Sequence, residues 1–243
     1  MQYIIGNWKM ELTPSESVDL ALAIREKTTQ SENLKTKYSV VLCPTFTALE
    51  DVGQVLTESN ILLGAQDVAA EEKGALTGEV SARELHDIGC AYCIVGHSER
   101  RANFGETDDM IHHKIQLLIQ HGITPILCVG ETAEERATGK TNAVVDAQLA
   151  VLGNISTPTP LLIAYEPRWV IGTGKPVSVA EAEEVIQHIR TQLGANISQY
   201  AVLYGGAVDA ASASAFLASP LIEGLLIGTA SRKVDEFTAI ICG

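Results

Sequence analysis

The stretch TPILCVGETAEE at residues 124–135 places a short apolar run directly before the start of a helix. The run at residues 124–129 is continuous rather than alternating, which is typical of a parallel strand that is covered on both faces. Thr132 and Glu135 then form a capping box, in which each side chain accepts a hydrogen bond from the backbone amide of the other. The stretch therefore predicts a buried strand, a tight turn and a helix.

The same unit recurs along the whole chain. Further apolar runs, each followed by a helical pattern, lie at residues 3–8, 39–43, 61–65, 91–96, 161–165, 201–204 and 224–227. Capping boxes of the same form begin at Thr13, Ser81 and Ser178, and Pro14 stands at the first helical position after Thr13. Apolar residues at helical spacing follow the first and last of these boxes: Leu20, Ala23 and Ile24, and Val185, Ile186 and Ile189.

Strict alternation of strands and helices predicts an α/β fold with a parallel sheet. Eight such units in 243 residues fit a closed (β/α)8 barrel, the TIM barrel, with eight parallel strands inside an outer ring of helices. An open doubly wound sheet is the competing architecture, but the glycine fingerprint expected after its first strand is missing. No linker, low-complexity tract or charge block divides the sequence, so residues 1–243 are expected to form a single domain.

The chain is acidic, because 17 Lys and Arg stand against 30 Asp and Glu and give a net charge of −13. This balance argues against a nucleic-acid partner, since affinity for phosphate backbones depends on Lys and Arg. A small anionic substrate remains compatible with it, because one local cluster of donors outweighs a distant negative field. The sequence has neither an apolar run long enough to span a bilayer nor a signal-peptide pattern, so we expect no membrane partner.

The cysteines predict a cytoplasmic protein. An odd and low count is untypical of a secreted disulfide scaffold, so we expect reduced thiols at Cys43, Cys90, Cys93, Cys128 and Cys242. Cys90 and Cys93 have C-x-x-C spacing, so a metal or redox site is the alternative to two reduced thiols. No second pair completes a zinc set, and strand residues three apart point to opposite faces. We therefore expect no metal and no cofactor.

The ends of the predicted strands carry the residues suited to chemistry, because active groups of a βα barrel come from that face. Asn7 and Lys9 lie at the end of the first strand, His97 and Glu99 at the end of the fourth, and Glu166 at the end of the sixth. A carboxylate opposite an imidazole suits proton transfer next to a carbonyl. Glycine-rich turns after the sixth, seventh and eighth strands, at residues 172–174, 205–206 and 228, expose backbone amides that suit a phosphate.

Each of these residues also has a purely structural interpretation. Lys9 suits a solvated strand end, His97 a structural histidine at the rim, and the glycine pair a tight turn. Glu166 has Arg100 or Arg168 as an alternative partner in an ion pair. The prediction that all of these groups share one rim favours the functional interpretation.

Along essentially its whole length the chain resembles the triosephosphate isomerase family. The segments that carry the resemblance are residues 6–10, 64–66, 76–79, 95–101, 104–107, 128–131, 164–167 with 169, 171–175 and 204–206. Each segment alone is a weak signal, but their order and spacing together are highly specific. The resemblance implies interconversion of dihydroxyacetone phosphate and glyceraldehyde 3-phosphate.

The resemblance also implies roles for individual residues. Glu166 would be the base and His97 the neutral electrophile, a pairing for which triosephosphate isomerase is itself the standard example. Lys9 would supply positive charge, Asn7 would contact the substrate or hold Lys9, and Glu99 would support the lysine. Residues 167–177 would form a closing loop, and the phosphate would be held by the amides of Gly172, Ala207, Gly228 and Thr229. Thr77 would insert into a partner subunit and give a homodimer.

Two alternatives remain beside this reading. One is a non-catalytic barrel that binds a phosphorylated ligand, and the other is an isomerase of another small sugar phosphate. Loss of Glu166, His97 or Lys9 would indicate the former, and all three are present.

Four positions depart from the family pattern: Glu11, Arg168, Ala207 and Thr229 stand where Asn, an aliphatic residue, Ser and Gly are usual. Ala207 keeps its amide and loses only a hydroxyl group. Arg168 places a bulky charge in the first hinge of the closing loop. Thr229 is expected to have a negative φ, because a β-branched residue is strained at positive φ, and its hydroxyl is a candidate N-cap of the final helix.

Overall fold

The computed structural model describes residues 1–153, 155, 160–171 and 176–243, and the strands in these ranges close into a barrel. The strands are β1 (Gln2–Asn7), β2 (Tyr38–Cys43), β3 (Ile61–Ala65), β4 (Tyr92–Val95), β5 (Thr124–Val129), β6 (Leu161–Tyr165), β7 (Tyr200–Tyr204) and β8 (Gly224–Ile227). Each strand pairs in parallel with the next, and β8 pairs with β1. The predicted eight-stranded parallel barrel is confirmed.

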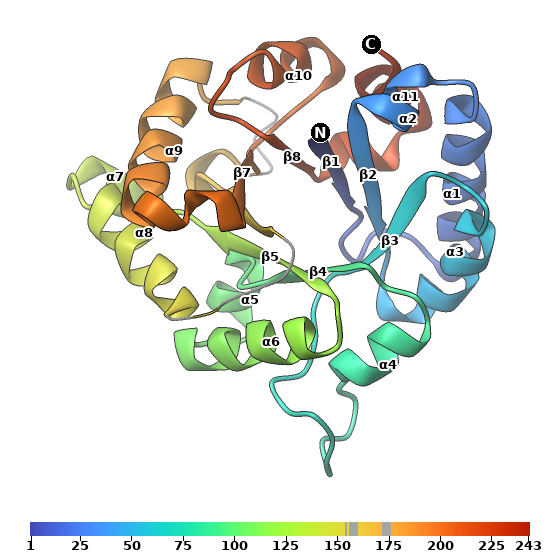
Figure 1. Ribbon diagram of the computed structural model, residues 1–243, viewed down its shortest axis with the longest axis horizontal. Coiled ribbons are helices and arrows are strands. Elements are labelled where there is room, and N and C mark those ends of the chain that lie inside the picture. The colour runs from blue at the N-terminus through green and yellow to red at the C-terminus, as the bar shows by residue number, and fades with distance from the viewer. Residues whose placement is uncertain (154, 156–159, 172–175) are drawn as a thin grey trace.

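The helices surround the barrel (Figure 1). The α-helices are α1 (Pro14–Thr28), α2 (Glu32–Thr36), α3 (Leu49–Leu56), α4 (Ala82–Asp87), α5 (Ser98–Asn103), α6 (Asp108–Gln120), α7 (Ala133–Ala137), α8 (Thr141–Leu149), α9 (Val179–Leu193), α10 (Ala210–Leu217) and α11 (Val234–Cys242). Short 3-10 turns are η1 (Phe46–Ala48), η2 (Ala150–Leu152), η3 (Arg168–Val170), η4 (Gly194–Gln199) and η5 (Thr229–Arg232). Figure 1 also shows the segment between β3 and α4 projecting away from the ring of helices.

The local signals in the sequence predict the helix starts correctly. Complete capping boxes precede α1, α4, α7 and α9, at the four positions expected. On α9 the buried face includes Val185, Ile186 and Ile189, as predicted. On α1 the buried stripe runs through Ala21 rather than Ala23. The sequence identified the helix itself but misplaced one residue of its inner face.

Two strands end earlier than their apolar runs do. β1 ends at Asn7 rather than at Trp8, and β4 at Val95 rather than at Gly96. Lys9 and Gly96 have φ angles of 54° and 67°, so the backbone leaves the extended conformation at these points. Both departures turn the chain at the rim where the predicted site residues lie.

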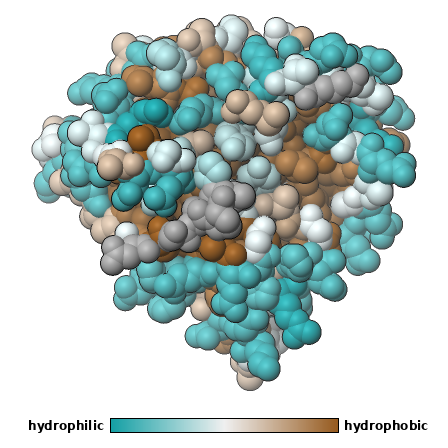
Figure 2. Space-filling view, in the orientation of Figure 1, coloured by the Kyte–Doolittle hydropathy of each residue, from teal (hydrophilic) through white to brown (hydrophobic). Residues whose placement is uncertain are grey.

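The apolar core has two parts. Alternate strand residues such as Ile5, Val41, Ile126 and Leu162 fill the inside of the barrel. The residues between them, such as Ile4, pack outward against the helices. Figure 2 shows hydrophilic residues over most of the outer rim, with hydrophobic residues exposed between them nearer the centre. Among the described helices, none is long and apolar enough to cross a membrane.

Candidate active site

The carboxyl ends of the strands open onto one cavity of about 570 Å³. Eight of the residues predicted from the sequence line this cavity: Asn7, Lys9, His97, Glu99, Glu166, Ala207, Gly228 and Thr229. Asn7 is the last residue of β1, and the others follow β1, β4, β6, β7 or β8, so closure of the barrel brings together groups that are distant in the chain. Gly172 lies outside the described residues.

His97 and Glu166 are in direct contact within the cavity. The imidazole Nε2 lies 3.1 Å from a carboxylate oxygen of Glu166, and the side chains are only 6% and 3% exposed. Burial acts to raise the pKa of Glu166, but the nearby His97, Lys9 and the Ser98 amide outweigh burial and hold that pKa below the usual value. The carboxylate is therefore ionised near neutral pH and able to accept a proton.

Neighbouring backbone fixes the position of Glu166. The amide of Ser98 donates to Oε2 at 3.4 Å. A Cβ atom at Gly205 would lie 2.8 Å from Cγ of Glu166, so only glycine leaves room for this side chain. The alternative partner Arg100 is instead paired with Asp67, with 2.8 Å between its Nη2 and a carboxylate oxygen. Glu166 thus contacts the imidazole rather than that arginine.

The imidazole of His97 is oriented by the start of α5. Its Nδ1 accepts a hydrogen bond from the amide of Glu99 at 3.2 Å, so in the neutral ring the hydrogen is assigned to Nε2. Burial acts to lower the pKa of His97, but the carboxylate of Glu166 outweighs burial and raises the pKa above its ordinary value. The ring therefore presents an N–H group toward Glu166 and the cavity.

Lys9 is held from several sides. Its amide donates to the Asn7 side chain at 3.1 Å, and its carbonyl accepts from Gln66 at 2.9 Å. Its Nζ lies 2.5 Å from a carboxylate oxygen of Glu99. Asn7 thus holds the backbone of Lys9, one of its two expected roles, and Glu99 lies beside the lysine as expected. Gln66 is a support that was not predicted from the sequence, although residues 64–66 are among the segments that resemble the family.

Among the described residues, the turns after β7 and β8 leave backbone donors free on the cavity wall. The carbonyl of Gly228 accepts from both the amide and the hydroxyl of Ser231. No described residue accepts a hydrogen bond from the amide of Thr229 or of Ala207. A Cβ at Gly228 would lie 3.6 Å from Cε of Lys9, so the lysine side chain runs beside this turn. Free amides next to a cation form an arrangement that suits an anion.

The conformation of Thr229 agrees with one expectation and contradicts another. Among the described residues other than glycine, only Lys9 and Glu58 have positive φ, so the negative φ predicted for Thr229 is confirmed. The prediction that Thr229 caps the final helix is wrong. Thr229 is the first residue of η5, whose N-cap is Gly228, and α11 begins after Lys233. An intervening 3-10 turn separates Thr229 from the final helix.

Glu131 anchors the beginning of the predicted closing loop. One of its carboxylate oxygens lies 3.2 Å from both Tyr165 Oη and Trp169 Nε1 and accepts a hydrogen bond from each. Arg136 donates to the same oxygen at 3.3 Å, and its guanidinium lies over the Trp169 ring at 4.9 Å. Glu131 is fully buried. These contacts fix Tyr165 and Trp169, which flank Glu166 in the chain.

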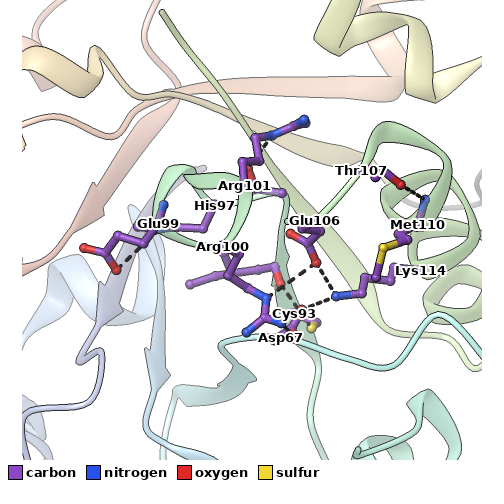
Figure 3. Close-up of polar contacts among 12 residues, drawn as sticks. Asp67, Cys93, His97, Glu99, Arg100, Arg101, Glu106, Thr107, Met110 and Lys114 are labelled. Atoms are coloured by element: carbon purple, nitrogen blue, oxygen red, sulfur yellow. Dashed lines mark hydrogen bonds and ion pairs between the residues drawn. The ribbon is translucent and has the colours of Figure 1, made fainter. Parts of the chain in front are cut away.

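A buried ion network supports α5, which carries Glu99 (Figure 3). Lys114 is 2% exposed and is paired with Asp67 at 2.7 Å and with Glu106. Arg100 of α5 is paired with the same two carboxylates. Asp67, Glu106 and Lys114 are not among the site residues predicted from the sequence. A signal was available, because Lys114 lies on the apolar face of α6, at helical spacing from the buried residue Ile111.

Thr77 lies on the projecting segment between β3 and α4 and is exposed, outside the residues that line the cavity. Several large apolar side chains are also exposed, among them Met10 at 91%, Phe104 at 69% and Leu76 at 45%. The chain thus offers apolar surface both at the barrel mouth and on the projecting segment.

The five cysteines carry free thiols, as expected, with four of them buried and Cys242 exposed. Burial raises the pKa of Cys90 to about 12, so this thiol stays protonated. Within the described residues, no group of three or more His, Cys, Asp and Glu side chains is placed to hold a metal ion.

Comparison with known proteins gives one consistent result. Residues 2–243 match the family model described as triosephosphate isomerase. The triosephosphate isomerase of Carboxydothermus hydrogenoformans is 46% identical, over 99% of this chain and 98% of that protein. The enzyme of that name from Magnetococcus marinus is 41% identical, over 99% and 97% of the two chains. That from Chlorobaculum tepidum is 43% identical, over 98% of each chain.

Proposed function

The chain belongs to the triosephosphate isomerase family, and from that premise we propose which of its residues carry the reaction. The chain is an intramolecular aldose–ketose isomerase that interconverts dihydroxyacetone phosphate and glyceraldehyde 3-phosphate. The observation that supports the assignment of roles most strongly is the buried contact between the Glu166 carboxylate and the His97 imidazole.

Glu166 is the base of the proposed mechanism. Its carboxylate takes a proton from the carbon beside the substrate carbonyl, and the electrons of that C–H bond form the C=C bond of an enediolate. The negative charge moves to the former carbonyl oxygen. Glu166 then returns the proton to the neighbouring carbon, which is the former carbonyl carbon. The hydroxyl proton on the other oxygen passes by way of His97 to the negatively charged oxygen, which leaves a new C=O group and gives the isomeric sugar phosphate. The lowered pKa of Glu166 keeps the carboxylate in the form that accepts the proton.

His97 is the electrophile. A substrate lying between His97 and Glu166 separates the two side chains, which weakens the interaction that raises the pKa of His97. Burial and the hydrogen bond from the Glu99 amide to Nδ1 both favour the neutral ring. The Nε2–H group then donates to the substrate oxygen on which negative charge develops.

Lys9 and the backbone turns bind the charged parts of the substrate. The amides of Ala207, Gly228 and Thr229 hold the phosphate, and Lys9 beside Gly228 offsets the negative charge. Gly172 is proposed as a further amide donor, although its position lies outside the described residues. Holding the phosphate supplies binding energy remote from the reacting carbons.

Residues 167–177, of which 172–175 lie outside the described residues, are proposed to close over the bound substrate. An enediolate beside a phosphate ester can eliminate phosphate, so water and free rotation have to be denied to the intermediate. The contacts of Trp169 with Glu131 and Arg136 fix one end of this segment. In the proposed closure, the segment moves while its beginning at Trp169 stays in place.

The two alternative functions lack a supporting observation. A non-catalytic barrel does not need a buried carboxylate held against an imidazole, and Glu166, His97 and Lys9 all line the cavity. The proposal is tested by a coupled assay that compares glyceraldehyde 3-phosphate with longer sugar phosphates. Turnover of the triose phosphate alone supports the proposal. Turnover of none of them supports the binding protein, and preference for a longer sugar supports the other isomerase.

We further propose a homodimeric, cytoplasmic protein in which residues 1–243 form one domain. Thr77 on the projecting segment and the exposed apolar residues Met10 and Leu76 support assembly with a second copy. Five free thiols fit a reducing compartment. The closed barrel with its continuous outer core supports the single domain.

A further inference from the structure

An ion pair joins the loop after β1 to the turn after β8. Nη1 of Arg232 lies 2.8 Å from a carboxylate oxygen of Glu11. Glu11 is two residues beyond Lys9, and Arg232 is the last residue of the η5 turn that begins at Thr229. Both side chains line the cavity. The pair therefore connects the segment that carries Lys9 with the segment proposed to hold the phosphate.

The backbone of Lys9 lies between two links to that same turn. On one side, Trp8 Nε1 donates to the carbonyl of Ser231 at 3.2 Å in a buried hydrogen bond. On the other side stands the Glu11–Arg232 pair. Lys9 itself has a φ of 54°, a conformation that a residue with a side chain keeps only where surrounding contacts impose it. The two links supply such contacts.

Arg232 depends on Glu11 for its position. Its Nε is buried, and no described residue accepts a hydrogen bond from that atom. The Arg232 side chain is 20% exposed and that of Glu11 is 55% exposed, so the pair is only partly shielded from water. Without Glu11 the guanidinium would lose its carboxylate partner, and the loop after β1 would lose its outer link to η5.

The charges of the cavity indicate that the pair acts through geometry. Among the described residues, the Lys and Arg side chains lining the cavity are Lys9, Arg232 and Lys233, and their carboxylate partners are Glu99, Glu11 and Glu236 respectively. Since Glu11 already neutralises Arg232, the net field of this pair on a bound dianion is small. Its contribution is the distance that it fixes between the two segments.

We propose that Glu11 and Arg232 form a clamp that holds the Lys9 loop against the phosphate-binding turn and thereby positions Lys9 for the substrate. Both are positioning residues, because they act through Lys9 rather than on the substrate. The inference rests on the proposed role of Lys9 in substrate binding.

A double-mutant cycle of Glu11→Gln, Arg232→Gln and the combined variant tests the clamp. Each single change raises KM for glyceraldehyde 3-phosphate by about two- to fivefold, the size available to a partly exposed ion pair. The turnover number stays close to that of the wild type. The combined variant is no worse than either single variant, because both remove the same link.

Lys233 and Glu236 supply the matched control. Their pair, with 2.7 Å between Nζ and Oε1, lines the same cavity but links residues three apart within one segment. Lys233→Gln and Glu236→Gln make the same charge changes without breaking a connection between loops, so KM stays that of the wild type. Glu11→Asp keeps the charge and shortens the side chain, so it raises KM as Glu11→Gln does. Glu11→Asp also serves as the test if Arg232→Gln does not fold.

Several results would overturn the clamp. If Glu11→Gln lowers KM while Arg232→Gln raises it, the charges act directly on the substrate. An equal change of KM in Lys233→Gln and Glu236→Gln would have the same meaning. An unchanged KM in Glu11→Gln, Arg232→Gln and the combined variant would show that the pair does not position Lys9. A KM increase found only in variants that sediment more slowly than the wild type would assign the pair to assembly. Lys9→Met separates the two proposals. If Lys9→Met leaves KM and turnover unchanged, the proposed role of Lys9 is refuted. If Lys9→Met impairs the enzyme but the Glu11 and Arg232 variants keep the KM of the wild type, only the clamp is refuted.

Discussion

Nε2 of His97 and Oε1 of Glu166 lie 3.1 Å apart across the mouth of the barrel. The two residues follow β4 and β6, which are not neighbours in the barrel because β5 lies between them. Both side chains are buried, and they are in contact with each other in the same cavity. A substrate that reaches one of them therefore also reaches the other. A base and a hydrogen-bond donor that share one ligand are what the isomerisation of an α-hydroxy carbonyl compound needs.

Glu166→Gln should abolish most of the activity without removing the binding site. Glutamine has nearly the same shape as glutamate but cannot accept the proton. Turnover should fall by roughly 10²–10⁴-fold or more, as for a lost acid–base group. Affinity for a phosphate-bearing inhibitor should survive, and Glu134→Gln on the exposed face of α7 is the control for the substitution itself. Near-native turnover of Glu166→Gln would refute the assignment of the base.

The His97–Glu166 contact should stabilise the fold most strongly in a defined pH window. The pKa of Glu166 is lowered from 4.5, so its contribution is present above that pH and is lost as the pH falls through the lower folded-state pKa. The pKa of His97 is raised from 6.5, so its contribution is present below that pH and is lost as the pH rises through the higher folded-state pKa. The difference in unfolding free energy between wild type and Glu166→Gln should therefore be largest between pH 4.5 and 6.5. Urea denaturation across the pH range measures it, and a difference that keeps increasing up to pH 9 would contradict the pairing.

Thr229→Pro should weaken phosphate binding while leaving the fold intact. Proline is tolerated at the first position of a helical turn, and the preceding Gly228 adapts to it. The substitution deletes the amide donor, so inhibitor affinity should fall by about 1.5–3 kcal/mol. Thr229→Gly keeps the donor and should change affinity by less than about 1 kcal/mol. Inhibitor titration of variants checked by circular dichroism measures both, and wild-type affinity in a folded Thr229→Pro protein would remove Thr229 from the site.

Lys114→Met should strongly destabilise the protein. The change leaves Asp67 and Glu106 buried with Arg100 as their only remaining cation among the described residues. Removing one partner from a buried ion pair costs about 3–5 kcal/mol. Lys27→Met is the matched control, because Lys27 pairs with Asp235 on the surface, where solvent screens the pair and little stability is lost. Equal losses of unfolding free energy in the two variants would refute the importance of the buried network.

The protein should sediment with twice the mass of one chain in dilute solution. Closed twofold pairs are the commonest oligomers, and Thr77 on the projecting segment is the residue proposed to dock in the partner. Thr77→Arg places a charged, bulky side chain at that contact and should shift the protein toward the monomer, whereas Thr57→Arg at the end of α3 should not. A monomer with full wild-type activity would contradict the proposed dimer.

The sequence by itself determined the order of strands and helices. A parallel strand is encoded by a continuous apolar run, and a helix start by a capping box only four residues long, so both signals are local. The boxes at Thr13, Ser81, Thr132 and Ser178 therefore all appear where the sequence placed them. The same locality explains the error at Thr229, whose side chain resembles an N-cap although the chain first makes a separate 3-10 turn.

The tertiary structure decided which side chains meet. No local pattern indicates that Glu166 pairs with His97 rather than with Arg100, because the choice depends on how the strand ends are arranged when the barrel closes. The same holds for Lys114 with Asp67 and for Glu11 with Arg232, whose partners lie on other elements. An ion pair between distant residues forms only where packing of the core sets the distance between their backbones, and that distance is a property of the whole fold.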